Sequence, residues 1–154
     1  MDAILRTDGG SRGNPGPGGA GFVLEDPRGA LIANGGKFLG DVTNNVAEYE
    51  ALLWGLRVAA KRGVKTLTVY ADSELLVKQM NGVYRCKHPN MIPLFNQARA
   101  LVSRFDSVRI VHVRREENAA ADRLANEAMD ARGSVGTEAD TSETPAQGTL
   151  FGEG

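Results

Sequence analysis

Four acidic residues of this chain stand where they could share one site: Asp8, Glu48, Asp72 and Asp122. Asp8 and Asp72 each end an apolar run of strand type, and sites in α/β sheets form at the carboxyl ends of strands. Glu48 and Asp122 border the apolar stripes of two predicted helices. Taken singly, each acid also fits a structural role as a turn former, a helix cap or a partner of the helix dipole.

Together, the four acids indicate a different chemistry. Carboxylates that converge without neutralisation repel one another and raise their own pKa values. Hard divalent cations relieve that repulsion, and Mg²⁺ prefers oxygen ligands, several waters and substrate phosphates. Two such ions can activate a water and stabilise the leaving oxygen of an in-line displacement at phosphorus. The acids therefore predict metal-dependent hydrolysis of a phosphodiester.

The elements that must position these acids follow from the periodicity of the sequence. Strand and helix signals alternate in the order βββαβααβα, which favours a mixed sheet covered by helices. GGSRGNPGPGG, after the first strand, is predicted to be a turn-dense loop. Strands are expected at 2–8, 19–26, 30–38, 65–71 and 108–114, and helices at 44–62, 73–80, 90–104 and in ENAAADRLANEAMDARG, which Gly133 terminates.

The composition excludes several classes of protein. The 154 residues, 42% hydrophobic and 24% charged, are typical of one soluble domain. Cys86 is the only cysteine, which excludes an intrachain disulfide and a four-thiolate zinc site. No run approaches the ~20 apolar residues of a membrane span. The first residues carry Asp2 and turn polar by Arg6, unlike a signal peptide, so we expect a cytoplasmic protein.

Charge divides the chain into two parts. Beyond Arg132 there are four acids and neither Lys nor Arg, so the net charge of −1 becomes +3 for residues 1–132 alone. A mildly basic domain permits nucleic-acid binding without demanding it. Residues 133–154 are rich in Gly, Ser, Thr, Glu and Ala and poor in core formers. We predict a folded domain over 1–132 and an acidic disordered tail or linker over 133–154.

Four segments carry a resemblance to a known family. TDGGSRGNPGPGGAGFVL, TNNVAEYEALLWGL, VYADSELLVKQMNG and REENAAADRLANEA resemble the active-site segments of type 1 ribonuclease H, in family order through residues 1–132. The short connection before the last segment resembles the archaeal-like and bacterial short-loop members. The resemblance implies a ribonuclease H-like fold: a five-stranded mixed sheet with helices on both faces.

The resemblance also implies an activity and its cofactor. The family hydrolyses the RNA strand of RNA–DNA hybrids endonucleolytically with two Mg²⁺ ions, leaving 5′-phosphate and 3′-hydroxyl ends, and Mn²⁺ is a possible substitute. By position, the catalytic metal ligands are Asp8, Glu48, Asp72 and Asp122, the same acids that the residue pattern singles out.

Six residues match the family's contacts with the substrate. An enzyme for hybrids must sense 2′-hydroxyl groups, which are exposed in the minor groove of A-like duplexes. By position, Gly9, Gly10 and Ser11 are expected along the RNA strand, where small residues permit close approach. Polar contacts in the minor groove are expected from Asn14, Asn44 and Asn45, although Asn-Asn before a helix also fits an N-cap.

One departure from the family concerns a histidine. Many members carry a histidine on a flexible loop before the last helix, but here residues 114–117 alone form that connection. His112 falls within a predicted strand and His88 between two predicted helices. Arg115 resembles an arginine of short-loop members and could sit near the scissile phosphate, or it is an exposed loop residue.

The tail suggests one partner. Gln147-Gly148-Thr149-Leu150-Phe151 resembles the Q-x-x-L-F peptide by which bacterial replication proteins dock on the sliding clamp, with Gln147, Leu150 and Phe151 as contacts, or it is a chance match. Nothing in the sequence demands a dimer, so a monomer is expected. Three alternatives stay open: a catalytically inactive hybrid-binding module, another nuclease of the ribonuclease H-like superfamily, and a fragment of a larger enzyme.

Overall fold

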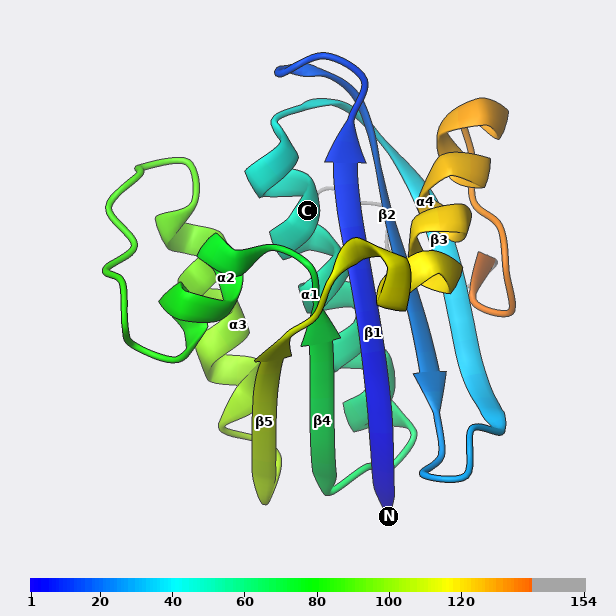
Figure 1. The fold of residues 1–154 in the computed structure, drawn as a ribbon, viewed down its shortest axis with the longest axis vertical. Coiled ribbons are helices and arrows are strands. Elements are labelled where there is room, and N and C mark those ends of the chain that lie inside the picture. The colour runs from blue at the N-terminus through cyan, green and yellow to red at the C-terminus, as the bar shows by residue number, and fades with distance from the viewer. Residues whose placement is uncertain (140–154) are drawn as a thin grey trace.

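A computed structural model describes residues 1–139, which are built around one five-stranded sheet (Figure 1). Its strands lie in the order β3-β2-β1-β4-β5. The β1–β2 and β2–β3 pairs are antiparallel, whereas β4 is parallel to both β1 and β5. The predicted mixed sheet is confirmed. Its strands are β1 (Asp2–Ser11), β2 (Gly16–Glu25), β3 (Leu31–Val42), β4 (Thr66–Ala71) and β5 (Ser107–His112).

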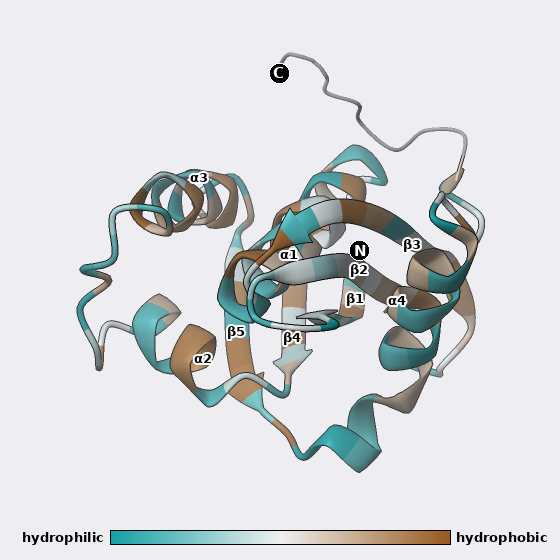
Figure 2. Ribbon diagram, turned by 90° about the horizontal axis from the view of Figure 1, so that it is seen from above, coloured by the Kyte–Doolittle hydropathy of each residue, from teal (hydrophilic) through white to brown (hydrophobic). Residues whose placement is uncertain are grey.

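Helices cover both faces of this sheet, as predicted. In Figures 1 and 2, α1 packs on one face together with α3, and α4 crosses the other face over β2 and β3. No helix within residues 1–139 is long and apolar enough to cross a membrane. The helices are α1 (Asn44–Lys61), α2 (Glu74–Met80), α3 (Ile92–Val102) and α4 (Ala119–Ala131), and a 3-10 turn, η1 (Arg115–Asn118), directly precedes α4.

The main core lies between α1 and the sheet. The apolar stripe of α1 buries its side chains against those of β1 and β2, as its 3.6-residue period requires. Trp54 is 2% exposed and meets Phe22 edge to face, with ring centroids 4.8 Å apart. Thr43 caps α1, because its hydroxyl accepts a hydrogen bond from Val46 N at 3.3 Å. This packing fixes the first turns of α1, which carry Glu48, beside the end of β1.

On the opposite face, α4 sits unusually close to β2. A Cβ atom on Gly21 would lie 2.3 Å from the carbonyl oxygen of Ala121, so only glycine permits this approach. Ala121, Ala125 and Ala128 present the small, buried face of α4 to the sheet. Small residues on both sides therefore allow the α4 backbone to pack directly on the sheet. This close packing fixes the distance between the sheet and the side chains at the edge of the α4 face, such as Asp122.

The glycine-rich segment differs from the predicted loop. Gly9, Gly10 and Ser11 continue β1 and pair with Ala20, Gly19 and Gly18 of β2. The connection between the two strands is reduced to residues 12–15, and β3 likewise runs on to Val42. Backbone hydrogen bonds between antiparallel strands do not require large side chains. The glycine-rich composition, which is typical of turns, therefore did not reveal that these residues belong to strands. The consequence is that residues 9–11 lie on a rigid strand beside the start of α1.

Residues 133–139, assigned above to the tail, form a strap along β3. Gly36 and Val135 exchange backbone hydrogen bonds of 3.0 and 2.8 Å, and Thr137 binds both backbone and side chain of Asn34. Glu138 is 7% exposed and pairs with Arg62 at the end of α1 at 2.8 Å. The folded unit thus extends to residue 139. Residues 140–154, including the expected clamp peptide, lie outside the described residues.

Ending the chain after Arg132 is expected to lower the free energy of unfolding by roughly 2 kcal/mol, since several backbone hydrogen bonds and one half-buried ion pair are lost. A chain that ends after Ala139 is the matched control and should unfold like the full chain. Urea denaturation measures both. Equal stability of the two truncated chains would contradict a stabilising strap.

Candidate active site

Two acids meet through the register of the parallel strands. Thr7 of β1 pairs with Ala71 of β4, so Asp8 and Asp72 follow side by side at the same end of the sheet. Asp72 is the first residue after β4, and its side chain is only 9% exposed. The structure therefore brings together the two strand-end acids that the sequence pattern paired.

The other two acids come from helices on opposite faces. Glu48 lies in the second turn of α1 and is half-buried, because Ala47 and Tyr49 on either side of it enter the core. Asp122 lies in the first turn of α4, between buried Ala121 and exposed Arg123. Both side chains reach the cleft at the end of β1, and all four acids line it.

The cleft has a volume of about 690 Å³ and is mostly polar at its rim. Of the predicted substrate residues, Gly9, Gly10, Ser11, Asn44 and Asn45 line it beside the acids. Asn14 does not; it lines a neighbouring hollow with Thr43, Asn45, His88 and Asn90. One cleft thus joins the four acids to a strip of small and amide side chains.

Hydrogen bonds hold this strip together. The Asn44 Oδ1 atom accepts from Ser11 N at 2.8 Å, and Asn44 N donates to Asn14 Oδ1 at 3.0 Å. The suggestion that one of the paired asparagines caps α1 is wrong, because Thr43 is the cap. Asn44 instead ties the end of β1 to the start of α1 through its Oδ1 and N atoms, and its exposed side chain still has an Nδ2 donor to offer.

The cleft is strongly unfavourable to negative charge when no cation is bound. Burial, followed by the charges of Asp72 and Asp122, raises the pKa of Asp8 from 3.8 to about 9. Burial raises the pKa of Glu48 to about 7, although a hydrogen bond from Ser73 opposes this shift. A cation that entered the cleft would replace the missing counter-charge. Burial is the main cause at both carboxyl groups, and the charge of Asp72 adds to it in each, so part of each pKa shift is the repulsion between acids that the sequence predicts.

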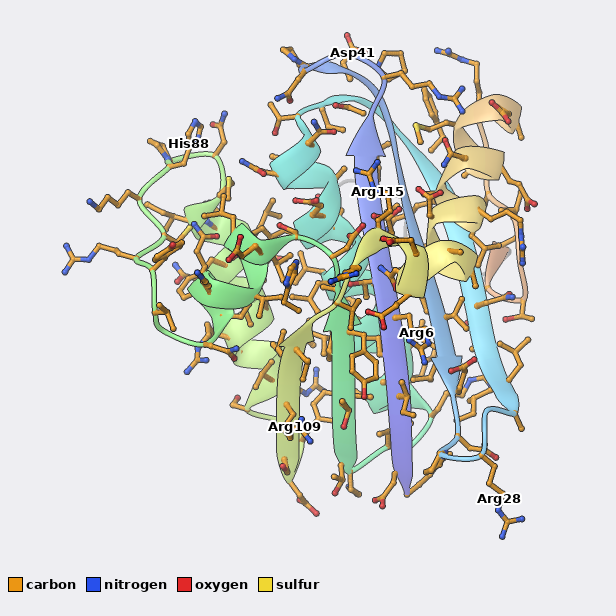
Figure 3. All side chains as sticks on the ribbon, in the orientation of Figure 1. Arg6, Arg28, Asp41, His88, Arg109 and Arg115 are labelled. Atoms are coloured by element: carbon orange, nitrogen blue, oxygen red, sulfur yellow. The ribbon has the colours of Figure 1, made fainter. Side chains whose placement is uncertain are left out.

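Basic groups compensate little of this charge. The Arg115 Nε atom lies 3.8 Å from Asp72 Oδ2, but the side chain is 84% exposed, so the pair is weak. Figure 3 shows Arg115 beside β1, whereas His88 lies on the loop between α2 and α3. Neither His88 nor His112 lines the acid cleft. Arg12 also lines the cleft, but its guanidinium pairs with Asp130 at 2.8 Å. Of these two arginines, Arg115 is the one that pairs with one of the four acids, so it is placed to meet a bound phosphate near them.

Two contributors to the cleft were missed from the sequence. Ser73 caps α2 through Leu76 N at 3.2 Å and also supports Glu48, and the run Asp72-Ser73 directly before a helix was the available signal. Asn126, one turn after Asp122, donates to the Asp122 carboxylate at 3.3 Å and accepts from Arg12. Its spacing of four residues from Asp122 predicts such a contact.

Comparison with known proteins identifies the family. A family model described as "Reverse transcriptase-like" matches residues 6–128. The structure of a ribonuclease H1 from the archaeon Halobacterium salinarum superimposes with a TM-score of 0.83 at 41% identity, covering 85% of this chain and 99% of that one. The chain belongs to the type 1 ribonuclease H family. The predicted ribonuclease H-like fold is thereby confirmed.

Other type 1 ribonuclease H domains are equally similar. The N-terminal ribonuclease H domain of a Mycobacterium tuberculosis protein gives a TM-score of 0.84 at 44% identity, over 86% of this chain and 96% of that one. LC11-RNase H1, isolated from compost and solved in complex with an RNA/DNA hybrid, gives 0.80 at 41% identity, over 84% and 97%.

The ribonuclease H match extends over only part of the longer curated relatives. A bifunctional protein of Mycobacterium tuberculosis is 46% identical over 132 residues, which are 85% of this chain but 36% of that protein. Ribonuclease HI of Halobacterium salinarum is 44% identical over 80% of this chain and 62% of its own length. The chain thus spans about a third of the first relative and under two thirds of the second.

Proposed function

We propose that this chain is an endoribonuclease that hydrolyses the RNA strand of RNA–DNA hybrids. The observation that carries the proposal is the gathering of Asp8, Glu48, Asp72 and Asp122 around one cleft, beside the strip formed by residues 9–11 and Asn44. Membership of the ribonuclease H family supports it, as does the similarity to a relative that is described in complex with an RNA/DNA hybrid. One chain supplies all four acids, so a monomer suffices.

The donor set fits hard divalent cations. The cleft offers carboxylate oxygens, and burial together with the neighbouring acids raises the pKa of Asp8, which a bound cation would oppose. Mg²⁺ takes few protein carboxylates, keeps several waters and binds substrate phosphates. Asp8, Glu48, Asp72 and Asp122 would hold two Mg²⁺ ions, or Mn²⁺ in their place.

The reaction adds one water across the P–O3′ bond of the RNA strand, which leaves a 5′-phosphate on one product and a 3′-hydroxyl on the other. Bound divalent ions would lower the pKa of the attacking water and stabilise the negative charge on the leaving oxygen. The strand of residues 9–11 lets the RNA backbone approach closely, since its glycines carry no side chain. Asn44 and Asn45, with Asn14 beside them, present amide groups to the minor groove, where 2′-hydroxyl groups are read.

Arg115 is proposed to bind the scissile or released phosphate. Replacing it, as Arg115→Ala, is expected to lower kcat roughly tenfold, the loss of one charge-assisted hydrogen bond. The melting temperature should not change, because the Arg115 side chain is 84% exposed and its pair with Asp72 is long. Arg123→Ala, an exposed arginine on α4 that does not line the cleft, is the control. Equal activity of the two variants would make Arg115 a solvent-exposed loop residue.

Strand-specific cleavage tests the proposal. A hybrid labelled on its RNA strand in one sample and on its DNA strand in another is incubated with the protein in Mg²⁺, beside matched DNA–DNA and RNA–RNA duplexes. The RNA strand of the hybrid should be cut and its DNA strand left intact, and chelation of Mg²⁺ by EDTA should stop the reaction. Binding without cleavage in Mg²⁺ or Mn²⁺ would instead favour an inactive hybrid-binding module, and cleavage of the DNA strand another nuclease of the superfamily.

We propose separately that residues 143–154 bind a bacterial sliding clamp through Gln147, Leu150 and Phe151. Leu150 and Phe151 would fill a hydrophobic pocket, and Gln147 would supply the polar anchor. Calorimetry with a peptide of residues 143–154 tests this, and the same peptide with Leu150→Ala and Phe151→Ala is the control. Absence of binding by the unmodified peptide would refute it.

A further inference from the structure

One buried amide side chain joins the segments that carry two of the four acids. Asn118 is 1% exposed, and its Nδ2 atom donates to the carbonyl oxygen of Thr7 at 2.6 Å, across 111 positions of sequence. Thr7 directly precedes Asp8 in β1. Asn118 lies four positions, and so about one turn, before Asp122 at the entry to α4. The hydrogen bond therefore links the backbone next to one acid with the helix turn below another.

This side chain does not serve as the helix cap that its position predicts. Asparagine at an N-cap ordinarily accepts from a backbone N–H in the first turn, but Asn118 makes no such hydrogen bond. Its Oδ1 atom is buried and finds no partner within residues 1–139. A buried, unpaired acceptor costs about 1–3 kcal/mol. The protein tolerates that cost at a position where the Nδ2 donor to β1 is in use.

The neighbouring contacts fix the start of α4 on β1 at the same place. Arg6 donates to the carbonyl oxygen of Glu117 at 3.4 Å, and the Glu117 carboxylate accepts from Arg114 N at 3.2 Å. In Figure 3, Arg6 projects from β1 below this turn. η1 is thus docked on the strand. The hydrogen bond from Asn118 to Thr7 adds a further tie at the start of α4 and opposes a shift of α4 relative to β1.

We propose that Asn118 is a positioning residue that sets the separation of the Asp8 and Asp122 carboxylates and thereby the affinity of the cleft for divalent cations. The inference deepens the proposed function and rests on it for the nature of the ligand. Outer partners of metal ligands commonly contribute 10- to 100-fold in metal affinity or activity. Asn118 acts one step further out, through the backbone of β1 and the first turn of α4.

Two substitutions separate positioning from capping. Asn118→Ala removes both the hydrogen bond to Thr7 and any capping of α4. Asn118→Ser keeps a good capping hydroxyl, but its side chain is too short to reach the Thr7 carbonyl oxygen. Gln79→Ala is the matched control, because Gln79 is a buried amide, 5% exposed, that binds the Tyr49 hydroxyl and does not line the acid cleft. Mn²⁺ is titrated into each protein without nucleic acid, and the rise in melting temperature reports binding. kcat and KM for a hybrid are then measured against Mg²⁺ concentration.

For both Asn118 variants, the Mn²⁺ concentration that gives half of the rise in melting temperature is expected to increase roughly tenfold or more. Their kcat should be lower than that of the wild type at limiting Mg²⁺, and their KM for the hybrid should be unchanged. Gln79→Ala should lose stability only. An unchanged Mn²⁺ midpoint in Asn118→Ser, failure of both variants to fold, or no Mn²⁺ shift in the wild type would each overturn the inference. A wild type that binds Mn²⁺ but cuts no hybrid would overturn the proposed function alone, since ion binding still decides the role of Asn118.

Discussion

Asp8→Asn is expected to abolish hybrid cleavage and, at the same time, to raise the melting temperature of the metal-free protein. Asp8 stands at the centre of the four acids, between the charges of Asp72 and Asp122. Without its carboxylate the cleft loses a ligand for cations that supply several kcal/mol of charge stabilisation, so kcat should fall about 10³-fold or more. Binding of the hybrid should persist, because the variant carries one negative charge less.

The gain in stability follows from the pKa of Asp8. The unfolded chain releases this proton near pH 3.8, whereas burial and the two neighbouring acids keep it on the folded protein up to about pH 9. Rising pH over that interval therefore favours the unfolded state, and the metal-free wild type loses stability as pH rises. The amide introduced by Asp8→Asn has no proton to lose, so at pH 8 the variant should be more stable by an amount on the order of 2 kcal/mol.

Melting temperatures between pH 4 and pH 9 in EDTA measure this effect, beside cleavage rates in Mg²⁺. Asp106→Asn is the control, because Asp106 is exposed and precedes β5 at the opposite end of the sheet. The difference between Asp8→Asn and the wild type should grow with pH, and that of the control should stay flat. An Asp8→Asn protein that cleaves at more than about a tenth of the wild-type rate would remove Asp8 from the metal ligands.

Gly9→Ala is expected to lower the free energy of unfolding by about 3 kcal/mol or more, which is roughly 10 °C in melting temperature for a domain of this size. A Cβ atom on Gly9 would lie 2.2 Å from the carbonyl oxygen of Ala47 and 2.6 Å from the backbone nitrogen of Glu48. Neither atom can move without displacing α1 from β1. That displacement would also separate Glu48 from Asp8, so activity should fall with stability.

Gly10→Ala is the matched control for this substitution. A Cβ atom on Gly10 would meet nothing closer than the Asn44 Oδ1 atom at 3.7 Å, an ordinary contact. Its stability should stay within about 0.5 kcal/mol of the wild type, as is usual for substitutions that create no overlap. Urea denaturation measures the free energy of unfolding of the two variants. Equal losses of stability in Gly9→Ala and Gly10→Ala would contradict the close packing of α1 against β1 at Gly9.

The four acids could be predicted from the sequence, because each lies on a strand or helix with a regular apolar pattern. Asp8 and Asp72 end strands of clear apolar pattern, and parallel register then brings them together. Glu48 and Asp122 lie at the edges of the apolar stripes of α1 and α4. Each stripe packs on the sheet, so a side chain at its edge lies near the sheet as well. Local periodicity and the rule for strand ends are sufficient for such residues.

Features held by backbone contacts or by distant partners could not be predicted in this way. The strap at 133–139 contains few core residues, yet Val135 pairs with Gly36 and Glu138 with Arg62. Asn118 finds its partner 111 positions away, at a carbonyl group that any residue would provide. Backbone pairing leaves no mark on side-chain composition, so both features emerge only from the fold.

A duplex of DNA that contains one internal run of ribonucleotides in one strand provides the most direct measurement. Cleavage in Mg²⁺ by the wild type and by Asp8→Asn is mapped to single nucleotides, beside the same duplex with no ribonucleotides. The wild type should cut only within the ribonucleotide run, leaving 5′-phosphate and 3′-hydroxyl ends, and the variant should not cut. Cuts in the deoxyribonucleotide portions would contradict specificity for ribonucleotides. An Asp8→Asn variant that cuts like the wild type would contradict a catalytic site formed by the four acids.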